Sequence, residues 1–335
     1  MSIVNSLIFD EICNRGCIRD ADVAQLREAY YADGQILENE AASLFEINDA
    51  CRVQETTWAP FFIEAIADFI INDAEPQGYI TKTNADWLIN CVSRDGSVQT
   101  QTELELLLKV LDTARWSPEC LVEFTLQQVK LAVCDGTGPL RAGTTLEAGT
   151  ITDDDVDLLR RILYAFAGDG NIAITRKEAE ILFDINDHIA DGPQNPVFTE
   201  LFIKAISSCV MAASGYSAPP REEMLRREAW LESRGELSLG NMLTNAFQGG
   251  FAGIFGIYQE QTAEQRALAR LEQQRLEIIT NQEITNSEAS WLVERIDRDD
   301  QITPNEEALL LCIKEASPKI APELEPLLDK VDQAA

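Results

Sequence analysis

The 335-residue sequence has few of the residue types on which most catalytic and metal sites depend. It contains one histidine, His188, and its eight cysteines form no CxxC pair. A structural zinc site needs four clustered Cys or His ligands, so this pattern disfavours one. We expect the thiols to stay reduced and to pack as small apolar groups. Scattered free cysteines of this kind predict a reducing, cytoplasmic location.

Basic residues are scarce as well. The chain has 27 Lys and Arg against 57 Asp and Glu, for a net charge of −30. Nucleic acids and anionic membranes attract basic surfaces, so we expect neither as an electrostatic partner. The acidic balance favours a cationic protein partner or divalent cations. Acidic helix faces that are simply solvated are an equally good interpretation.

Targeting and catalytic motifs are also missing. The N-terminus has no basic segment before Asp10 and Glu11, so we expect no signal peptide. The glycine turn Cys134–Gly138 lacks the Gly-Lys-Ser/Thr of a phosphate-binding loop. We expect His188 near a helix C-terminus, where a cationic imidazole is favoured. The sequence therefore predicts no enzyme.

An internal repeat occupies most of the chain. Each of four copies has an isoleucine after a turn, a leucine eight positions later, and a second acidic turn. These pairs are Ile18 and Leu26, Ile80 and Leu88, Ile151 and Leu159, and Ile284 and Leu292. The strongest match is Leu44-Phe45-Glu46-Ile47-Asn48-Asp49 with Leu182-Phe183-Asp184-Ile185-Asn186-Asp187. Fixed-period self-similarity of this kind is typical of stacked helical modules.

The turns of the repeats have the residues that begin helices. Thr285 to Glu288 is a capping box, in which hydroxyl and carboxylate satisfy backbone N–H groups reciprocally. Thr303-Pro304 places proline at the first helical position, where its missing N–H costs nothing. Asp153–Asp155 gathers carboxylates at a helix N-terminus, where the dipole favours them. Each copy is expected to close with a third helix opened by proline.

The pattern predicts an all-α protein of tandem helical-repeat domains, with EF-hand-like or TerB-like helix-turn-helix units and short Gly/Asp turns. We expect domain 1 at 1–134, with repeats at 14–73 and 74–134. A flexible linker is expected at 135–147. Domain 2 is expected at 148–335, with repeats at 148–216 and 278–335 and a helical, Gly-rich insertion at 217–277.

Several acidic turns resemble degenerate EF-hand loops, which bind calcium through loop positions 1, 3, 5, 7, 9 and 12. The candidate ligands are Asp33 and Glu40, Asp73 and Glu75, and Asp297, Asp299 and Glu306. None of the loops is complete, and Arg295 stands at position 1 of the last one. No cofactor is therefore expected. A poor calcium or magnesium site remains the alternative, and capped turns without an ion are favoured.

The insertion contains an uncharged, glycine-rich stretch from Leu239 to Tyr258. Polar residues interrupt it, which disfavours a membrane-spanning helix. Close helix contact at Gly249 and Gly253 would suit a partner, a second copy of the chain, or peripheral contact with a membrane interface. A hairpin packed on its own domain or in a homodimer is the simplest interpretation. The candidate interaction residues are Phe247, Phe251, Ile254, Phe255 and Ile257.

The half-motif Ala32-Asp33-Gly34-Gln35-Ile36 with Glu40, and its counterpart Asp95-Gly96-Ser97-Val98 with Glu103, resembles the repeated motif of TerB-like helical domains, the tellurite-resistance TerB and DjlA type. The resemblance covers roughly 14–134 and 145–332 without the insertion. It departs from the family in the extra Gly-x-Ile turns, in Asp300 where glycine is expected, and in the insertion. The resemblance implies a cytoplasmic protein of stress or metal response that acts by association. It also implies that Asp33, Glu40, Asp95 and Glu103 belong to an acidic surface patch.

The function predicted from the sequence is a non-enzymatic, acidic helical interaction or scaffold protein, with a protein partner or a second copy of itself. The first alternative is a calcium sensor of poor affinity built on the degenerate loops. The second alternative is an adaptor that associates with a membrane interface through 239–258.

Overall fold

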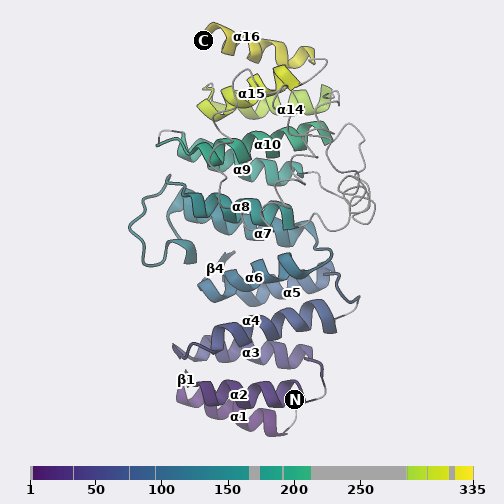
Figure 1. Ribbon diagram of the computed structural model, residues 1–335, viewed down its shortest axis with the longest axis vertical. Helices are drawn as coiled ribbons and strands as arrows, with labels where there is room; N and C mark the ends of the chain where they lie inside the picture. The colour runs from purple at the N-terminus through teal and green to yellow at the C-terminus, as the bar shows by residue number, and fades with distance from the viewer. Residues whose placement is uncertain are drawn as a thin grey trace, which may run out of the picture. The chain divides into compact units, whose positions relative to one another are not determined.

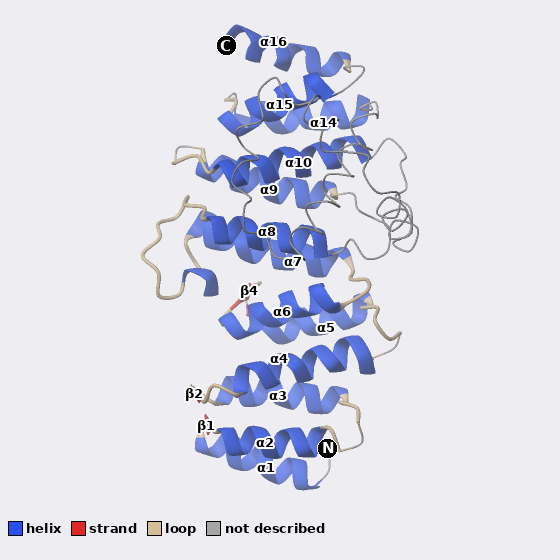
Figure 2. Ribbon diagram, in the orientation of Figure 1, coloured by secondary structure: helices blue, strands red, loops and turns tan. Residues whose placement is uncertain are grey.

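The computed structural model describes residues 3–32, 34–74, 76–94, 96–165, 174–190, 192–212, 284, 286–299, 301–316 and 321–334. The described chain is mostly helical (Figure 2), which confirms the predicted all-α class at this level. It divides into two compact units. Unit 1 is Met1–Thr150 with Arg161–Phe166, and unit 2 is Ile151–Arg160 with Ala167–Ala335.

Unit 1 is a stack of helices that follow one another in chain order (Figure 1). Its elements are α1 (Ile3–Arg15), β1 (Cys17–Ile18), α2 (Asp20–Tyr30), α3 (Glu38–Ala50), β2 (Val53–Gln54), α4 (Trp58–Asp68), η1 (Phe69–Asp73), α5 (Lys82–Val92), β3 (Ser93–Arg94), β4 (Ser97–Val98), α6 (Gln101–Thr113), α7 (Glu119–Lys130), η2 (Leu131–Asp135) and η3 (Pro139–Arg141). The segments η1 and η2 are π-helical continuations of α4 and α7.

The apolar positions of the sequence repeat form the core of each unit. Leu26 and Leu88 are completely buried in unit 1, and Leu159 and Leu292 are completely buried in unit 2. Burial of a leucine side chain contributes about 2 kcal/mol relative to exposure, so these positions are among those that hold the helices together. The segment before the first predicted repeat forms the helix α1, which packs against α2 and α3.

Glycines with positive φ turn the chain at the helix junctions of unit 1. Gly16, with φ 68°, ends α1 and leads into β1, which pairs in parallel with β2. Gly78, with φ 83°, precedes a single bridge between Tyr79 and Trp116. A side chain at Gly78 would also meet the Arg115 side chain, because a Cβ there would lie 3.1 Å from its Cδ. The antiparallel strands β3 and β4 flank the Asp-Gly turn before α6.

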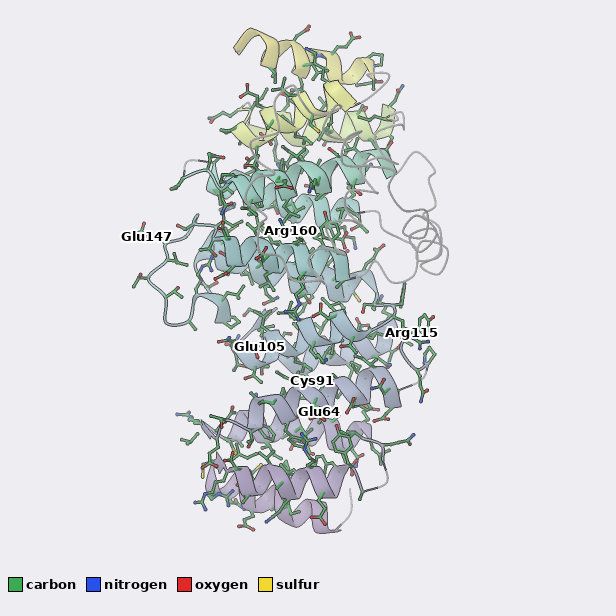
Figure 3. The ribbon with its side chains drawn as sticks, in the orientation of Figure 1. Glu64, Cys91, Glu105, Arg115, Glu147 and Arg160 are labelled. Atoms are coloured by element: carbon green, nitrogen blue, oxygen red, sulfur yellow. The ribbon has the colours of Figure 1, made fainter. Side chains whose placement is uncertain are left out.

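The segment predicted to be a flexible linker follows α7 and contains the 3-10 turn η3. Its two ends are tied together, because the Gly149 N–H donates to the Val133 carbonyl at 2.7 Å. The buried Arg141 guanidinium donates to the Thr150 carbonyl at 3.2 Å. Figure 3 places Glu147 on the outer side of this loop. Its flexibility remains a prediction.

Unit 2 contains the first part of α8 (Asp153–Ala165), followed by α9 (Arg176–Ile189), α10 (Pro196–Ala212), α14 (Asn286–Ile296), η6 (Asp297–Asp299), α15 (Pro304–Ala316), η7 (Pro322–Leu324) and α16 (Glu325–Ala334). The helix α10 packs against α9, α14 and α15. The predicted insertion 217–277 lies outside the described residues.

Candidate functional site

Among the described carboxylates predicted to bind cations, Asp73 and Glu40 bond to adjacent backbone N–H groups of one turn, whereas Asp297 and Glu306 lie before and at the start of α15. Asp33 and Glu75 fall outside the described residues, as does the side chain of Asp299. The Asp73 Oδ2 atom accepts a hydrogen bond from the Ile36 N–H at 2.8 Å. The Asp297 Oδ1 atom pairs with the Lys330 ammonium at 2.7 Å.

Glu40 and Glu306, the other two predicted ligands, are buried caps of their own helices. Glu40 Oε2 accepts from the Leu37 N–H at 3.2 Å at the start of α3. Glu306 Oε2 accepts from the Thr303 N–H at 2.8 Å at the start of α15. Their exposed fractions are 7% and 2%. A carboxylate held against helix N–H groups in this way offers fewer lone pairs to an ion.

The same cap begins α6 and α9, so four helices share it. Glu103 Oε2 accepts from the Thr100 N–H at 3.0 Å, and Glu178 Oε2 accepts from the Thr175 N–H at 2.7 Å. In both helices a second hydrogen bond runs in the opposite direction, because the threonine hydroxyl accepts from the N–H of the glutamate. These are complete capping boxes. Glu40 and Glu103 are therefore buried, which corrects the surface position that the TerB-like resemblance implies for them.

Within the part of the chain that the structure describes, no group of three or more His, Cys, Asp or Glu side chains is arranged to hold a metal ion. Binding of a cation by the predicted loops stays a prediction, because two of the candidate residues and one further side chain are not described. His188 lies in the last turn of α9, as predicted, where its Nδ1 bonds to the Asp184 carbonyl at 2.8 Å.

A concentrated group of charged side chains in the described chain surrounds Arg295 on α14. Its guanidinium contacts three carboxylates of α9, with distances of 3.0 Å to Glu180, 3.1 Å to Asp184 and 2.8 Å to Asp187. The Arg295 side chain is only 2% exposed, whereas each of the three carboxylates is about one-third exposed. The same guanidinium lies over the Phe183 ring at 4.8 Å. We call these five residues the Arg295 cluster.

The Arg295 cluster is closed on one side by Trp291. Its indole Nε1 donates to Glu180 Oε1 at 2.7 Å, and its ring lies edge-on to Phe183. Arg176 also lies over the ring of that tryptophan, with its guanidinium 5.2 Å from the ring centre. A guanidinium with paired carboxylates and an aromatic face satisfies the conditions under which a buried charge is tolerated. We interpret the cluster as a structural clamp between α9 and α14.

A second polar group lies beside the Arg295 cluster in unit 2. Asn186 donates to the Thr303 hydroxyl at 2.9 Å and accepts from the Asn305 amide at 2.9 Å. Thr199 donates to Asn305 at 2.6 Å and so connects α10. Buried polar side chains that satisfy one another fix the register of packed helices. This group therefore fixes the register of α9, α10 and α15.

Exposed apolar side chains at the helix junctions of unit 1 are the best-described candidates for contact with a partner. Tyr79 and Trp116, which form the single bridge before α5 and α7, are 36% and 37% exposed. Val53, at the corresponding position of the β1–β2 pair, is 65% exposed. Figure 3 shows Arg115 on the junction that carries Trp116. An exposed aromatic pair beside an arginine is typical of residues enriched at protein interfaces.

The interaction residues predicted in the insertion, Phe247, Phe251, Ile254, Phe255 and Ile257, lie outside the described residues. Among the helices that the structure does describe, none combines the length and apolar character needed to cross a bilayer.

Comparison with known proteins gives no relative. No family model matches the chain, and no match was found among curated proteins or among solved structures. The resemblance to TerB-like domains thus stays a prediction from the sequence.

Proposed function

We propose that the chain is a non-enzymatic, acidic helical scaffold that acts through association with other proteins. On this proposal the four sequence repeats are copies of a three-helix module related to TerB-like domains, and their turns display contact residues. Stress or metal response is the cellular setting that the resemblance suggests. The free thiols support a cytoplasmic location for this proposal.

The observation that carries the proposal is the use of the acidic turn residues as helix caps. Glu40, Glu103, Glu178 and Glu306 each direct an oxygen at a backbone N–H of their own helix. Catalysis by paired carboxylates would need those oxygens aimed at a substrate. If these glutamates have a structural role, the function depends on surface residues, which include Tyr79 and Trp116.

The burial of matching positions also supports a repeated module. Leu26, Leu88, Leu159 and Leu292 are all fully buried, although they are far apart in sequence. In repeat proteins each module buries its apolar face against its neighbours and presents its turns at the surface. The surfaces that such repeats present are suited to contact with other proteins.

The test is affinity capture with the full chain from a lysate of its native cells, with and without a divalent-cation chelator. We expect a defined set of proteins to be enriched equally under both conditions. The double variant Tyr79→Ala, Trp116→Ala should lose part of that set. Leu311→Ala, which removes an exposed apolar side chain in unit 2, is the matched control and should retain it.

Two outcomes contradict the proposal. Loss of the whole enriched set in chelator would favour the cation sensor. No enrichment over the empty resin, with wild-type chain and variants alike, would remove association as the function. Retention of the full set by the double variant would leave the scaffold but exclude the Tyr79–Trp116 junction as its contact surface.

A further inference from the structure

Three of the eight cysteines gather where the C-terminal ends of α1 and α3 meet. Cys13 is in the last turn of α1, Cys17 begins β1, and Cys51 is the C-cap residue of α3. The Cys51 thiol donates to the Ile12 carbonyl at 3.8 Å, next to Cys13 in the chain. Packing of α1 on α3, and the β1–β2 pair, hold this junction together.

The positive φ of Gly16 allows the two helix ends to approach. Its backbone N–H donates to the Ile12 carbonyl at 3.0 Å and closes α1, after which the chain turns into β1. A Cβ at Gly16 would lie 3.9 Å from the Ala50 carbonyl of α3. Cys17 then pairs with Val53, two residues beyond Cys51. The fold thus brings a thiol of α3 beside the two thiols that flank the end of α1.

The three thiols differ in access. Cys51 is 2% exposed, whereas Cys13 and Cys17 are partly exposed. Burial raises the pKa of the Cys51 thiol to about 11, and the neighbouring Cys13 and Cys17 thiols add to the rise. A buried, protonated thiol is protected from a dissolved oxidant. The partly exposed Cys13 and Cys17 are the thiols of this junction that a dissolved oxidant meets first.

We propose that this junction is a peroxide-sensitive oxidation site, in which Cys51 forms a disulfide with Cys13 or Cys17. The attacking thiolate comes from Cys17, or from Cys13 at higher pH, because burial and the charges of Glu46 and Asp10 raise the pKa of Cys13. This thiolate attacks one oxygen of hydrogen peroxide. The O–O bond breaks, hydroxide leaves, and a sulfenic acid remains. The Cys51 sulfur then attacks the sulfenic sulfur, the S–O bond breaks, and the hydroxyl leaves as water with the Cys51 proton. Two electrons pass from the two thiols to peroxide.

The disulfide would fasten α1 to the end of α3. The loop that it closes spans α2, α3 and the turn between them, so the oxidised chain should resist opening of its N-terminal helices. Strong reductants restore the two thiols. The site therefore makes the stability of the N-terminal end of unit 1 depend on redox conditions.

The test is disulfide mapping on the full chain after graded exposure to hydrogen peroxide, with blocking of the remaining thiols, digestion and mass spectrometry. We expect an intramolecular bond between Cys51 and Cys13 or Cys17, and slower hydrogen exchange in α1 that dithiothreitol reverses. Cys51→Ala should abolish both changes. Cys91→Ala and Cys120→Ala, which remove partly exposed thiols elsewhere in unit 1, should leave both unchanged.

Mapping on the wild-type chain keeps the test decisive if Cys51→Ala impairs folding. The proposal fails if Cys51 stays reduced at peroxide concentrations that oxidise Cys91 or Cys120. It also fails if the only bonds found join Cys13 to Cys17, or join two chains.

Discussion

The two compact units contain the same aromatic packing in different electrostatic surroundings. In unit 1 the Phe45 ring lies edge-on to Phe62 at 5.1 Å and to Trp87 at 5.8 Å. In unit 2 the Phe183 ring lies edge-on to Phe202 at 5.0 Å and to Trp291 at 6.0 Å. Phe45 and Phe183 occupy the same position of the matching sequence stretches. Edge-to-face packing of this kind adds about 1 kcal/mol per pair to the burial itself.

The electrostatic difference between the units comes from residues one helical turn away from these aromatic rings. Unit 2 has Glu180 and Arg295, and unit 1 has Ala42 and Cys91 at the corresponding sequence positions. Arg295 reaches three carboxylates of α9, whereas burial raises the pKa of the Cys91 thiol to about 11. The comparison shows that one apolar framework accepts either a thiol or an ion cluster as its neighbour. The apolar residues therefore define the packing of the helices, and the charged residues add contacts to packing that is already in place.

The largest expected effect comes from removing the central ring of either framework. Phe183→Ala should lower the stability of unit 2 by about 4 kcal/mol, because it leaves a large cavity in a fully buried site. Phe45→Ala should cost unit 1 about 1 kcal/mol less, since the structure records no guanidinium of the described residues over the Phe45 ring. Denaturant unfolding followed by hydrogen exchange of peptides from each unit would measure both. Equal losses would show that the cation–π contact of Arg295 contributes nothing.

The second effect comes from the Arg295 cluster itself. Arg295→Met should lower the stability of unit 2 by about 3 kcal/mol, because three carboxylates lose their common cation. Arg298→Ala is the matched control: this arginine is exposed, and its guanidinium lies 3.5 Å from Glu180. Its loss should cost less than about 1 kcal/mol. The same unfolding measurement compares the two variants.

Reproducing the unit 1 residues in unit 2 would sharpen this comparison. Glu180→Ala combined with Arg295→Cys gives the pair that unit 1 carries, and it should cost less than Arg295→Cys alone, since one unpaired carboxylate is removed as well. A double variant as unstable as the sum of its parts would show that Glu180 and Arg295 act independently.

Much of this architecture was predictable, because it depends on local signals. The capping boxes at Thr100 and Thr175 need only a hydroxyl and a glutamate three residues later, and the structure contains both. The buried leucines followed from a period that is visible in the sequence. The surface patch inferred from family resemblance placed Glu40 and Glu103 wrongly, since Glu103 is the buried partner of the Thr100 cap and Glu40 is buried at the start of α3.

The Arg295 cluster was missed because its partners lie over a hundred residues away in the chain. In the sequence, Arg295 stands out only as the residue that replaces a calcium ligand at position 1 of a degenerate EF-hand loop. A usable signal existed, since Ala42 and Cys91 of the first two repeats are replaced together by Glu180 and Arg295 in the last two. Opposite charges that appear together at two positions of a repeat indicate contact between them.

A smaller effect concerns the pH dependence of stability that two carboxylates of unit 1 produce. Burial raises the pKa of Glu103 from 4.5, against the hydrogen bonds from Thr100 that lower it. The folded chain therefore holds this proton to higher pH than the unfolded chain. The stability that Glu103 contributes is complete below pH 4.5 and falls as the pH rises through its raised pKa. Glu103→Gln should keep the cap and remove that fall.

The control for this pH effect is Glu64, whose pKa is lowered by its hydrogen bond with Arg27. Its contribution has the opposite sign, since it is present above pH 4.5 and lost as the pH falls through the lowered pKa. Thermal melting of unit 1 between pH 3 and 7 should show the Glu103→Gln and Glu64→Gln difference curves sloping in opposite directions. Parallel curves would contradict the assignment.

The smallest effect concerns an N-terminal helix cap, in which α5 has Asn84 where α8 has Asp155. At the start of α5 the Thr81 hydroxyl accepts from the Asn84 N–H at 3.1 Å. The Asn84 amide nitrogen is buried and makes no hydrogen bond to another described group. At the same position of α8, Asp155 accepts from both the N–H and the hydroxyl of Thr152.

Asn84→Asp should complete this cap and stabilise unit 1 by about 0.5 kcal/mol, because it replaces an unsatisfied donor with a carboxylate at the positive end of a helix. Asp155→Asn should cost unit 2 a similar amount. If both substitutions destabilise in thermal melts, the Asn84 amide has a partner that the cap comparison overlooks.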